Sequence, residues 1–393
     1  MAQMAHIRTV VPPRKAGQRD VLGLTAPPME TVRVAVIGLG IRGRQAVERL
    51  RRIPGASITV LCDINPAVDV PLEGAVFVQD WKAACAHPLV DLVYVCTDWS
   101  HHVPVAMEAM RCGKHVALEV PAAQTMEQIW ALVDSAEQTR RHCIMLENAV
   151  YDSFELTTLA MARAGVFGEI IHAEGAYHHR LDYGKEAWRL DYNRTLRGDI
   201  YPTHGIGPVC RALDIHRTDR LKTLVSLDTA AVTGPSLTGD AAFANADQTN
   251  TLLKTEQGRT ILIEHNVMTP RPYSRMYQLV GTLGYAAKYP VPQVCLLEGG
   301  AEVLYEGERL EALLASYRPA FLPAELVPVA QEVDTHGGMD YIMDYRLVQA
   351  LREGRPLDMD VYDLAEWCAV SPLSRLSLEA GGAPVSFPDF TRR

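Results

Sequence analysis

The sequence predicts an α/β fold with two unlike domains: a doubly wound parallel sheet, then an α+β domain with a largely antiparallel open sheet. Short apolar runs alternate with helix-compatible segments as far as about residue 150, which is typical of parallel strands joined by crossover helices. Later strands alternate apolar and polar residues, as in antiparallel sheets with one covered face. We expect an extended arm at residues 1–30, a first domain at 31–150 and a second at 151–393.

Composition narrows the class of protein. The 393 residues are 48% hydrophobic, which is enough for two cores, and the net charge of −9 argues against nucleic-acid binding. None of the eight cysteines forms a C-x-x-C pair, so we expect free thiols in a reducing compartment. No apolar run reaches the roughly 18–20 residues that a membrane span requires.

The first thirty residues contain the pairs Pro12-Pro13 and Pro27-Pro28 but no apolar segment typical of a secretory signal. We therefore expect the sequence as it stands to be cytoplasmic, with a periplasmic or secreted form open if a signal precedes it. We interpret these residues as an arm for which a neighbouring subunit is one packing partner. The protein is expected to be a homo-oligomer, either a dimer or a tetramer.

The first domain is expected to contain a parallel sheet of about six strands. Thr125 is placed to cap a helix whose apolar face is formed by Ile129, Leu132, Val133 and Ala136. The clearest strands are expected at residues 34–37, 57–63, 91–97, 115–120 and 142–147, and the helices at 44–52, 103–112 and 125–139.

A glycine-rich turn follows the first strand and carries the pattern G-x-G-x-x-G. Gly38 permits a sharp turn, Gly40 lets the backbone approach a pyrophosphate, and Gly43 lets the helix pack closely on the strand. Phosphates would then bind the free N–H groups of the helix N-terminus. Asp63 ends the next strand, where a carboxylate accepts hydrogen bonds from ribose hydroxyls and repels a 2′-phosphate. These features predict a Rossmann domain that prefers NAD over NADP.

Polar residues follow the C-terminal ends of three other strands, where ligands bind in a doubly wound sheet. They are Thr97-Asp-Trp-Ser-His-His102, Glu119-Val-Pro121 and Glu147-Asn-Ala-Val-Tyr151. We interpret the first segment as a contact to the nicotinamide or the ribose. The alternative is a plain polar loop that contains a helix cap. A buried carboxylate at Glu119 is costly unless it is paired, so a binding role is favoured. Asn148 can hold an amide or hydroxyl, whereas a structural role explains Tyr151 equally well.

The second domain contains two further clusters. Tyr177 to Arg180, with Trp188-Arg189 downstream, combines aromatic faces for sugar C–H groups with donors for hydroxyls and amides; an exposed strand end is the alternative. In Tyr201-Pro-Thr-His204, the histidine lies between turn-forming segments and is the best general acid/base candidate. Strands are expected at 168–179, 221–233, 248–255, 260–267 and 276–281, and helices at 340–354 and 361–381. The sequence leaves open whether these two helices return to cover the first domain.

Neighbouring histidines at 101–102 and 178–179 do not indicate a metal site. Adjacent residues of a strand point to opposite faces, and the sequence contains no H-x-x-x-H pair for a helix. We therefore expect no metal.

These motifs resemble the Gfo/Idh/MocA family of NAD(P)-dependent sugar oxidoreductases. Members usually have Glu-Lys-Pro, whose lysine assists proton transfer, whereas this sequence has Val120 at the middle position. Within that group the sequence resembles glycoside hydrolase family 109, the NAD-dependent α-N-acetylgalactosaminidase type. The segments that carry this resemblance are residues 99–102, 145–148, 174–177, 201–204, 271–275 and 357–363.

The resemblance implies that glycosidic bonds are cleaved through transient oxidation of a carbohydrate substrate. Tightly held NAD⁺ would take a hydride from C3, and the resulting ketone would acidify the proton at C2. A base would remove that proton while the aglycone leaves C1. Water would then add, and the hydride would return, so that the cofactor is recycled in each turnover.

The resemblance also implies roles for individual residues. His204 would act at the C3 hydroxyl in place of the lysine, and Tyr151 at C2 or the leaving oxygen, with Arg189 helping to lower the pKa of Tyr151. Beyond the glycines at 38 and 40, the cofactor positions are Arg42, Gly43, Asp63, Trp99, Ser100, His101, His102, Glu119, Val120 and Asn148. The sugar positions are Glu119, Tyr177, Arg189, Tyr201, His204 and Tyr273.

Two other functions stay open. One is an ordinary NAD-dependent sugar dehydrogenase that uses His204 instead of lysine. The other is a non-catalytic NAD-binding sugar sensor, which the valine at position 120 alone would permit. The exact sugar, its anomer and the natural aglycone are also open.

Overall fold

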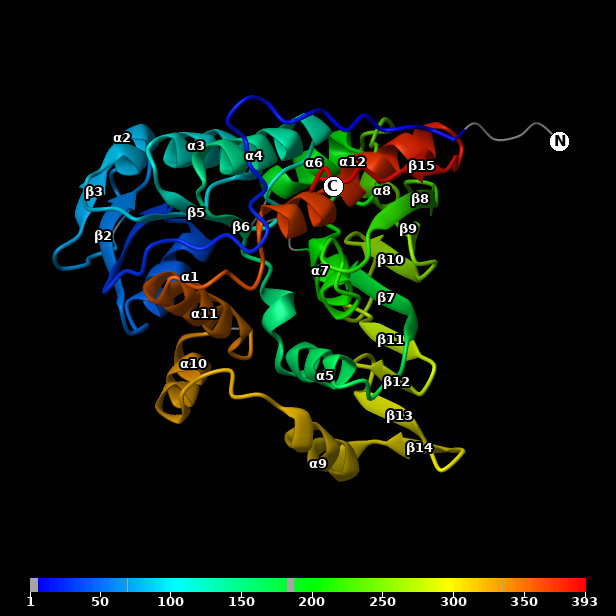
Figure 1. The fold of residues 1–393 in the computed structure, drawn as a ribbon. Coiled ribbons are helices and arrows are strands. Elements are labelled where there is room, and N and C mark those ends of the chain that lie inside the picture. The colour runs from blue at the N-terminus through cyan, green and yellow to red at the C-terminus, as the bar shows by residue number, and fades with distance from the viewer. Residues whose placement is uncertain (1–5, 69, 182–186, 335) are drawn as a thin grey trace.

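The computed structural model describes residues 6–68, 70–181, 187–334 and 336–393 and contains two sheets (Figure 1). In the first sheet every neighbouring pair is parallel and the order is β3-β2-β1-β4-β5-β6, which is the doubly wound Rossmann order. Its strands are β1 (Val32–Ile37), β2 (Ala56–Cys62), β3 (Val76–Val78), β4 (Leu92–Val95), β5 (His115–Leu118) and β6 (Cys143–Met145). The predicted parallel sheet is confirmed.

Helices cover this sheet, and three of them begin at a side-chain cap. The helices are α1 (Ile41–Leu50), α2 (Trp81–Ala86), α3 (Trp99–Arg111) and α4 (Met126–Thr139). Thr125 caps α4 by accepting the Gln128 N–H at 3.2 Å, as predicted. The predicted start of α3 at residue 103 is wrong, because Asp98 accepts the Ser100 N–H at 3.0 Å and the helix begins at Trp99. Residues 99–102 are therefore the first turn of a helix and not a loop.

The second sheet has nine strands in the order β14-β13-β12-β11-β7-β10-β9-β8-β15. Only the pair β7–β10 is parallel, so the largely antiparallel sheet expected from the sequence is confirmed. The strands are β7 (Ile170–His178), β8 (Leu221–Asp228), β9 (Thr249–Thr255), β10 (Thr260–Asn266), β11 (Gln278–Gly281), β12 (Gly284–Ala287), β13 (Gln293–Glu298), β14 (Ala301–Tyr305) and β15 (Val385–Ser386).

The helical segments after β6 surround the second sheet and return to the first. They are η1 (Asn148–Tyr151), α5 (Ser153–Arg163), α6 (Ala187–Thr195), α7 (Thr203–Ala212), α8 (Thr233–Thr238), α9 (Gly307–Tyr317), η2 (Ala324–Leu326), α10 (Val327–Val333), α11 (Met339–Glu353) and α12 (Val361–Glu379). Helix α11 contacts α1 and β1, whereas α12 contacts α4, β6 and also β8 (Figure 1). Helix α12 therefore bridges the two sheets, whereas α11 packs on the first. Within the described residues, no helix is both long enough and apolar enough to span a bilayer.

The N-terminal arm lies along its own chain, whereas the sequence had suggested a neighbouring subunit as one partner. Ile7 forms a parallel bridge with Val385 at the edge of the second sheet. Farther along, Arg14 donates to Glu137 of α4 at 3.0 Å. The arm thus runs from one sheet to the helices that cover the other (Figure 1).

Two glycines let α7 approach β7 backbone to backbone. A Cβ on Gly175 of β7 would lie 2.2 Å from the carbonyl oxygen of Gly205, and one on Gly205 would lie 2.7 Å from the Ala176 nitrogen. These distances are shorter than any relaxed contact. The first turn of α7, which carries His204, is therefore fixed directly against the sheet.

We expect Gly205→Ala to lower the free energy of unfolding by about 1–3 kcal/mol, because the added methyl group forces α7 away from β7. Denaturant-induced unfolding followed by circular dichroism measures this change. Gly40→Ala is the matched control, since its Cβ would meet no atom within 4 Å and its φ is −66°. Equal stability of the two variants would contradict this account of the packing.

Candidate functional site

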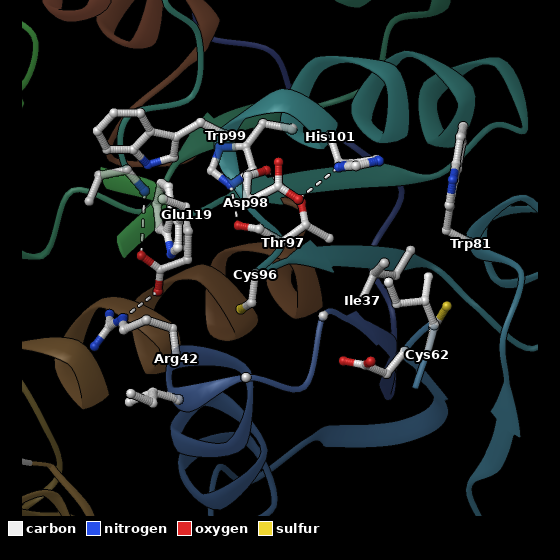
Figure 2. A pocket seen from close by; sticks show the side chains of 18 of the residues that line it. Ile37, Arg42, Cys62, Trp81, Cys96, Thr97, Asp98, Trp99, His101 and Glu119 are labelled. Atoms are coloured by element: carbon white, nitrogen blue, oxygen red, sulfur yellow. Dashed lines mark hydrogen bonds and ion pairs between the residues drawn. The ribbon is translucent and has the colours of Figure 1, made fainter. Parts of the chain in front are cut away.

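A cavity of about 530 Å³ lies at the C-terminal ends of β1, β2, β4 and β5 (Figure 2). Its volume falls within the range of small-molecule and cofactor sites. Nine of the expected cofactor residues line it: Gly38, Gly40, Arg42, Asp63, Trp99, His101, His102, Glu119 and Val120. The cavity therefore lies at the edge of the sheet where the sequence predicted the ligand site.

Three expected cofactor residues lie beside the cavity without lining it. A Cβ on Gly43 would lie 1.8 Å from the Gly38 carbonyl oxygen, so this glycine serves the close packing of helix and strand. Ser100 belongs to the cap of α3, where it contacts Asp98. Asn148 donates from Nδ2 to Oδ1 of Asp340 at 2.6 Å.

Asp63 lies beside the glycine-rich turn. One carboxylate oxygen accepts the Leu39 N–H at 2.7 Å and the other accepts the Asn65 N–H at 2.9 Å. A carboxylate offers about four acceptor positions, so it can still bind two ribose hydroxyls. Gly40 has open space where its Cβ would be, which leaves room for a pyrophosphate at the N-terminus of α1. These residues fit the nucleotide predicted from the sequence.

Glu119 is paired, as the cost of burying a carboxylate demands. Arg42 donates from Nε to Glu119 at 2.8 Å (Figure 2) and from Nη1 to Asp340 at 2.9 Å. Burial alone would lower the pKa of Arg42, but the two carboxylates raise it well above its ordinary value. The glycine-rich turn, the end of β5 and helix α11 are joined through this one guanidinium.

Sequence reasoning missed Asp340, which is 1% exposed. Besides Arg42 and Asn148, it accepts from Nδ1 of His336 at 2.9 Å. Burial would raise the pKa of Asp340, but His336 and the arginines hold it well below its ordinary value. An acid in the first turn of a predicted helix is ordinary, so the sequence contained no signal for this role.

An aromatic row extends from the cavity into the second domain; its members are Trp99, Tyr201, Tyr177, His179 and Tyr273. Trp99 and Tyr201 have ring centroids 5.8 Å apart, and Tyr201 stacks on Tyr177 at 4.7 Å. The hydroxyl of Tyr177 lies 2.9 Å from Nδ1 of His179, whose ring meets the edge of Tyr273 at 5.3 Å. The structure thus brings Tyr177, Tyr201 and Tyr273 together with His179, which belongs to the predicted sugar cluster at 177–180.

Arg189 lies where the aromatic row meets the cavity. Its guanidinium is 5.9 Å from the Trp99 ring, 5.3 Å from the Trp188 ring and 5.6 Å from the Tyr201 ring. Both Arg189 and Trp188 line the cavity. A cation held between aromatic faces is suited to bind a polar group of a ligand that spans both regions.

His204 lies in the first turn of α7, beside the aromatic row. Its ring centroid is 5.1 Å from that of Tyr177 and 5.1 Å from that of Tyr201. Its Nδ1 lies 2.5 Å from Oε1 of Glu147, a residue that the sequence placed at a strand end but gave no role. The side chain is 12% exposed, so it is held firmly yet stays accessible.

The structure corrects the expected surroundings of Tyr151. Its hydroxyl donates to Asp358 at 3.3 Å, and burial together with Asp358 raises its pKa well above the ordinary value. Arg189, which was expected to lower that pKa, lies instead against the rings of Trp99, Trp188 and Tyr201. The short helix η1 directs Tyr151 toward Asp358, which the sequence could not indicate.

Among the residues that the structure describes, two clusters bring histidine and carboxylate atoms close enough together to be considered as metal ligands: His216, Asp360 and Asp363, and Asp334, His336 and Asp340. Burial would lower the pKa of His216, but the carboxylates around it raise it to about 11, so a metal ion would have to displace a firmly held proton there. In the second cluster Asp340 is engaged by Arg42 and Asn148. Neither arrangement indicates a metal site.

Comparison with known families assigns both parts of the chain. Residues 151–393 match a family model described as "Glycosyl hydrolase 109, C-terminal domain". Residues 32–147 match one described as "Oxidoreductase family, NAD-binding Rossmann fold". The predicted NAD-binding Rossmann domain is confirmed.

Similar proteins of known sequence span nearly the whole chain. A glycosyl hydrolase family 109 protein of Porphyromonas gingivalis is 52% identical, over 99% of this chain and 90% of the relative. Glycosyl hydrolase family 109 protein 1 of Bacteroides fragilis is 51% identical, over 98% of this chain and 91% of the relative.

Solved structures share the fold at low sequence identity. Levoglucosan dehydrogenase in complex with NADH and L-sorbose has a TM-score of 0.73 at 16% identity, over 92% of this chain and 100% of that one. Scyllo-inositol dehydrogenase from Lactobacillus casei has a TM-score of 0.66 at 14% identity, over 91% and 99%. At such identities the likeness concerns the arrangement of the two domains.

Asp63→Asn removes the negative charge at the expected ribose position and keeps an oxygen for the Leu39 N–H. We expect NAD affinity to fall by about 10-fold or more, since hydrogen bonds to charged groups contribute about 1.5–3 kcal/mol. We also expect the preference for NAD over NADP to become smaller. Calorimetric titration of nucleotide-free protein with each nucleotide measures both. Asp98→Asn makes the same change at another acid of the cavity and should keep the preference for NAD over NADP. If Asp63→Asn also keeps that preference, Asp63 does not bind the ribose.

Proposed function

This chain belongs to glycosyl hydrolase family 109, and from that premise we propose that it cleaves N-acetylgalactosaminides through transient oxidation of the sugar at C3. The observation that carries the proposal is the continuity of the two binding regions. Trp99 lines the nucleotide cavity and is also the first ring of the aromatic row. A sugar lying along the row would therefore meet the cofactor at the end of the cavity.

The carboxylates near His204 favour this chemistry over direct hydrolysis. Ordinary glycosidases use two carboxyl groups across the scissile bond, one of them free to protonate the leaving oxygen. Here Glu119 is paired with Arg42, and Glu147 is completely buried behind His204. The rings of Tyr177 and Tyr201 lie against the His204 imidazole, each with its centroid 5.1 Å away.

Glu119, Asp63 and the glycine-rich turn would hold the cofactor, and bound NAD would supply a hydride acceptor that is restored within each turnover. His204 takes the proton of the C3 hydroxyl, since Val120 carries no ammonium group that could do so, and returns it in the reverse step. Tyr177 and Tyr201 cover the C–H face of the sugar, and Arg189 binds its polar substituents. Because Tyr151 is bonded to Asp358, the proposal gives the acid/base role to His204.

The identity of the sugar rests on the family resemblance of the segments at 174–177, 201–204 and 271–275. Elimination through C2 requires an acidic, accessible C2 proton and a base that takes it, while the aglycone leaves C1 with the electron pair of the broken C–O bond. It therefore constrains the configuration at C1 less than direct displacement does. Aryl glycosides that differ at C1, C2 and C4 would rank the substrates.

We expect His204→Ala to lower kcat/KM by about 10²–10⁴-fold, the usual contribution of a general acid/base, while NAD stays bound, because His204 does not line the nucleotide cavity. Release of the aryl group from an aryl α-N-acetylgalactosaminide measures turnover, and nucleotide released on denaturation measures NAD content. His87→Gln, at the C-terminus of α2, is the control and should match wild type. Near-wild-type turnover of His204→Ala would exclude the proposed role.

Removal of the nucleotide should abolish hydrolysis, and added NAD should restore it. During turnover the aryl group should be released without net accumulation of NADH, because the hydride returns to the sugar. Product analysis and NADH absorbance are recorded together. NADH formed in proportion to oxidised sugar would identify a dehydrogenase, and sugar binding without turnover would identify a sensor. Equal hydrolysis by stripped and replete protein would contradict the redox mechanism.

A further inference from the structure

The side chain of Glu147 lies directly behind the proposed acid/base. Glu147 follows β6 and is the N-cap of η1, so its Oε1 accepts the Ala149 N–H at 3.1 Å. The same oxygen lies 2.5 Å from Nδ1 of His204. The carboxylate is 0% exposed. One oxygen of Glu147 is therefore shared by a backbone N–H of the first domain and by His204 of the second.

This contact determines which nitrogen of His204 can react. An ionised carboxylate only accepts hydrogen bonds, so the Nδ1 facing Glu147 must carry the proton. In a neutral imidazole Nε2 is then the acceptor. Within the described part of the chain Nε2 forms no hydrogen bond, and the rings of Tyr177 and Tyr201 flank the imidazole. Nε2 is thus the atom that remains for the substrate.

Helix α7 leaves space for this glutamate. A Cβ on Gly207, three residues after His204, would lie 3.0 Å from Cγ of Glu147. Glycine at this position lets the glutamate stem pass beside the helix and reach Nδ1. His204, which Glu147 contacts, and Gly207, which leaves space for the glutamate side chain, therefore lie on adjacent turns of α7.

The burial of Glu147 makes a purely structural role costly. A buried carboxylate destabilises a fold unless it is paired, and Oε2 of Glu147 has no hydrogen-bond partner among the described residues. A glutamine of the same length would accept the same two hydrogen bonds with a smaller loss of solvation. What the carboxylate adds is a negative charge next to the imidazole, which stabilises the imidazolium formed when Nε2 takes a proton.

We propose that Glu147 is a positioning residue, which holds His204 in the tautomer with a free Nε2 and stabilises its protonated form. This inference rests on the acid/base role proposed for His204. One proton passes from the sugar hydroxyl to Nε2 and later returns. The Nδ1 proton stays between His204 and Glu147, and Glu147 itself is not protonated.

Glu147→Gln tests the proposal, because the amide oxygen can keep both hydrogen bonds while the negative charge that stabilises the protonated imidazole is lost. We expect kcat to fall by about 10²-fold or more, KM to stay within about 3-fold, and NAD content to be unchanged. The control is Glu137→Gln, the same change at a fully buried acid that pairs with Arg14 and Arg392. It should keep wild-type kcat, and a matching loss in that variant would overturn the proposal.

A double variant separates positioning from structural support. If Glu147 acts through His204, Glu147→Gln should cause no further loss in the His204→Ala background. Multiplicative losses would overturn the positioning role. Wild-type activity of His204→Ala would instead refute the function proposed for His204, whereas loss in His204→Ala with full activity in Glu147→Gln would refute only the role of Glu147.

A measurement on the wild-type protein does not depend on the folding of any variant. In protein labelled with ¹⁵N-histidine, the His204 resonances are identified by their loss in His204→Ala. They should report a proton on Nδ1 and none on Nε2 in the neutral ring. The opposite tautomer would overturn the proposal.

Discussion

The buried carboxylate of Asp340 is the point on which the geometry of the nucleotide site depends. It binds Arg42 after β1, Asn148 after β6 and His336 ahead of α11, and Arg42 in turn holds Glu119 after β5. Three strand ends of the parallel sheet are thereby tied to one helix of the second domain. Removing one partner of such a buried cluster typically costs about 3–5 kcal/mol, because the remaining charges lose their compensation.

A second connection crosses between the domains at the end of β6. There Glu147 reaches His204, while the next residue, Asn148, reaches Asp340. The proposed proton-transfer group and the nucleotide cavity are therefore positioned from the same short segment. The aromatic row gives these anchored groups a common surface, since Trp99 belongs to the sheet edge and Tyr177 and Tyr201 to the second domain.

Local patterns made the framework and part of the site predictable. The alternation of strands and helices, the glycine-rich turn and Asp63 depend on neighbouring residues, and the family resemblance drawn from such motifs is confirmed by the match to residues 151–393. Two other contacts join side chains that are far apart in the sequence. Asp340 lies 298 residues from its partner Arg42, and Glu147 lies 57 residues from His204. The surroundings of Tyr151 were misjudged for the same reason, because the direction of its hydroxyl is decided by η1 and Asp358.

The placement of α12 affects how the chain can fold during translation. This helix begins at Val361, 216 residues after the last residue of β6, Met145, and it is buried along most of its length between β8 on one side and α4 and β6 of the first domain on the other. Domains generally fold as they leave the ribosome, N-terminal part first. During synthesis the faces of α4 and β6 that α12 covers therefore stay uncovered until the second domain, including α12, has also left the ribosome.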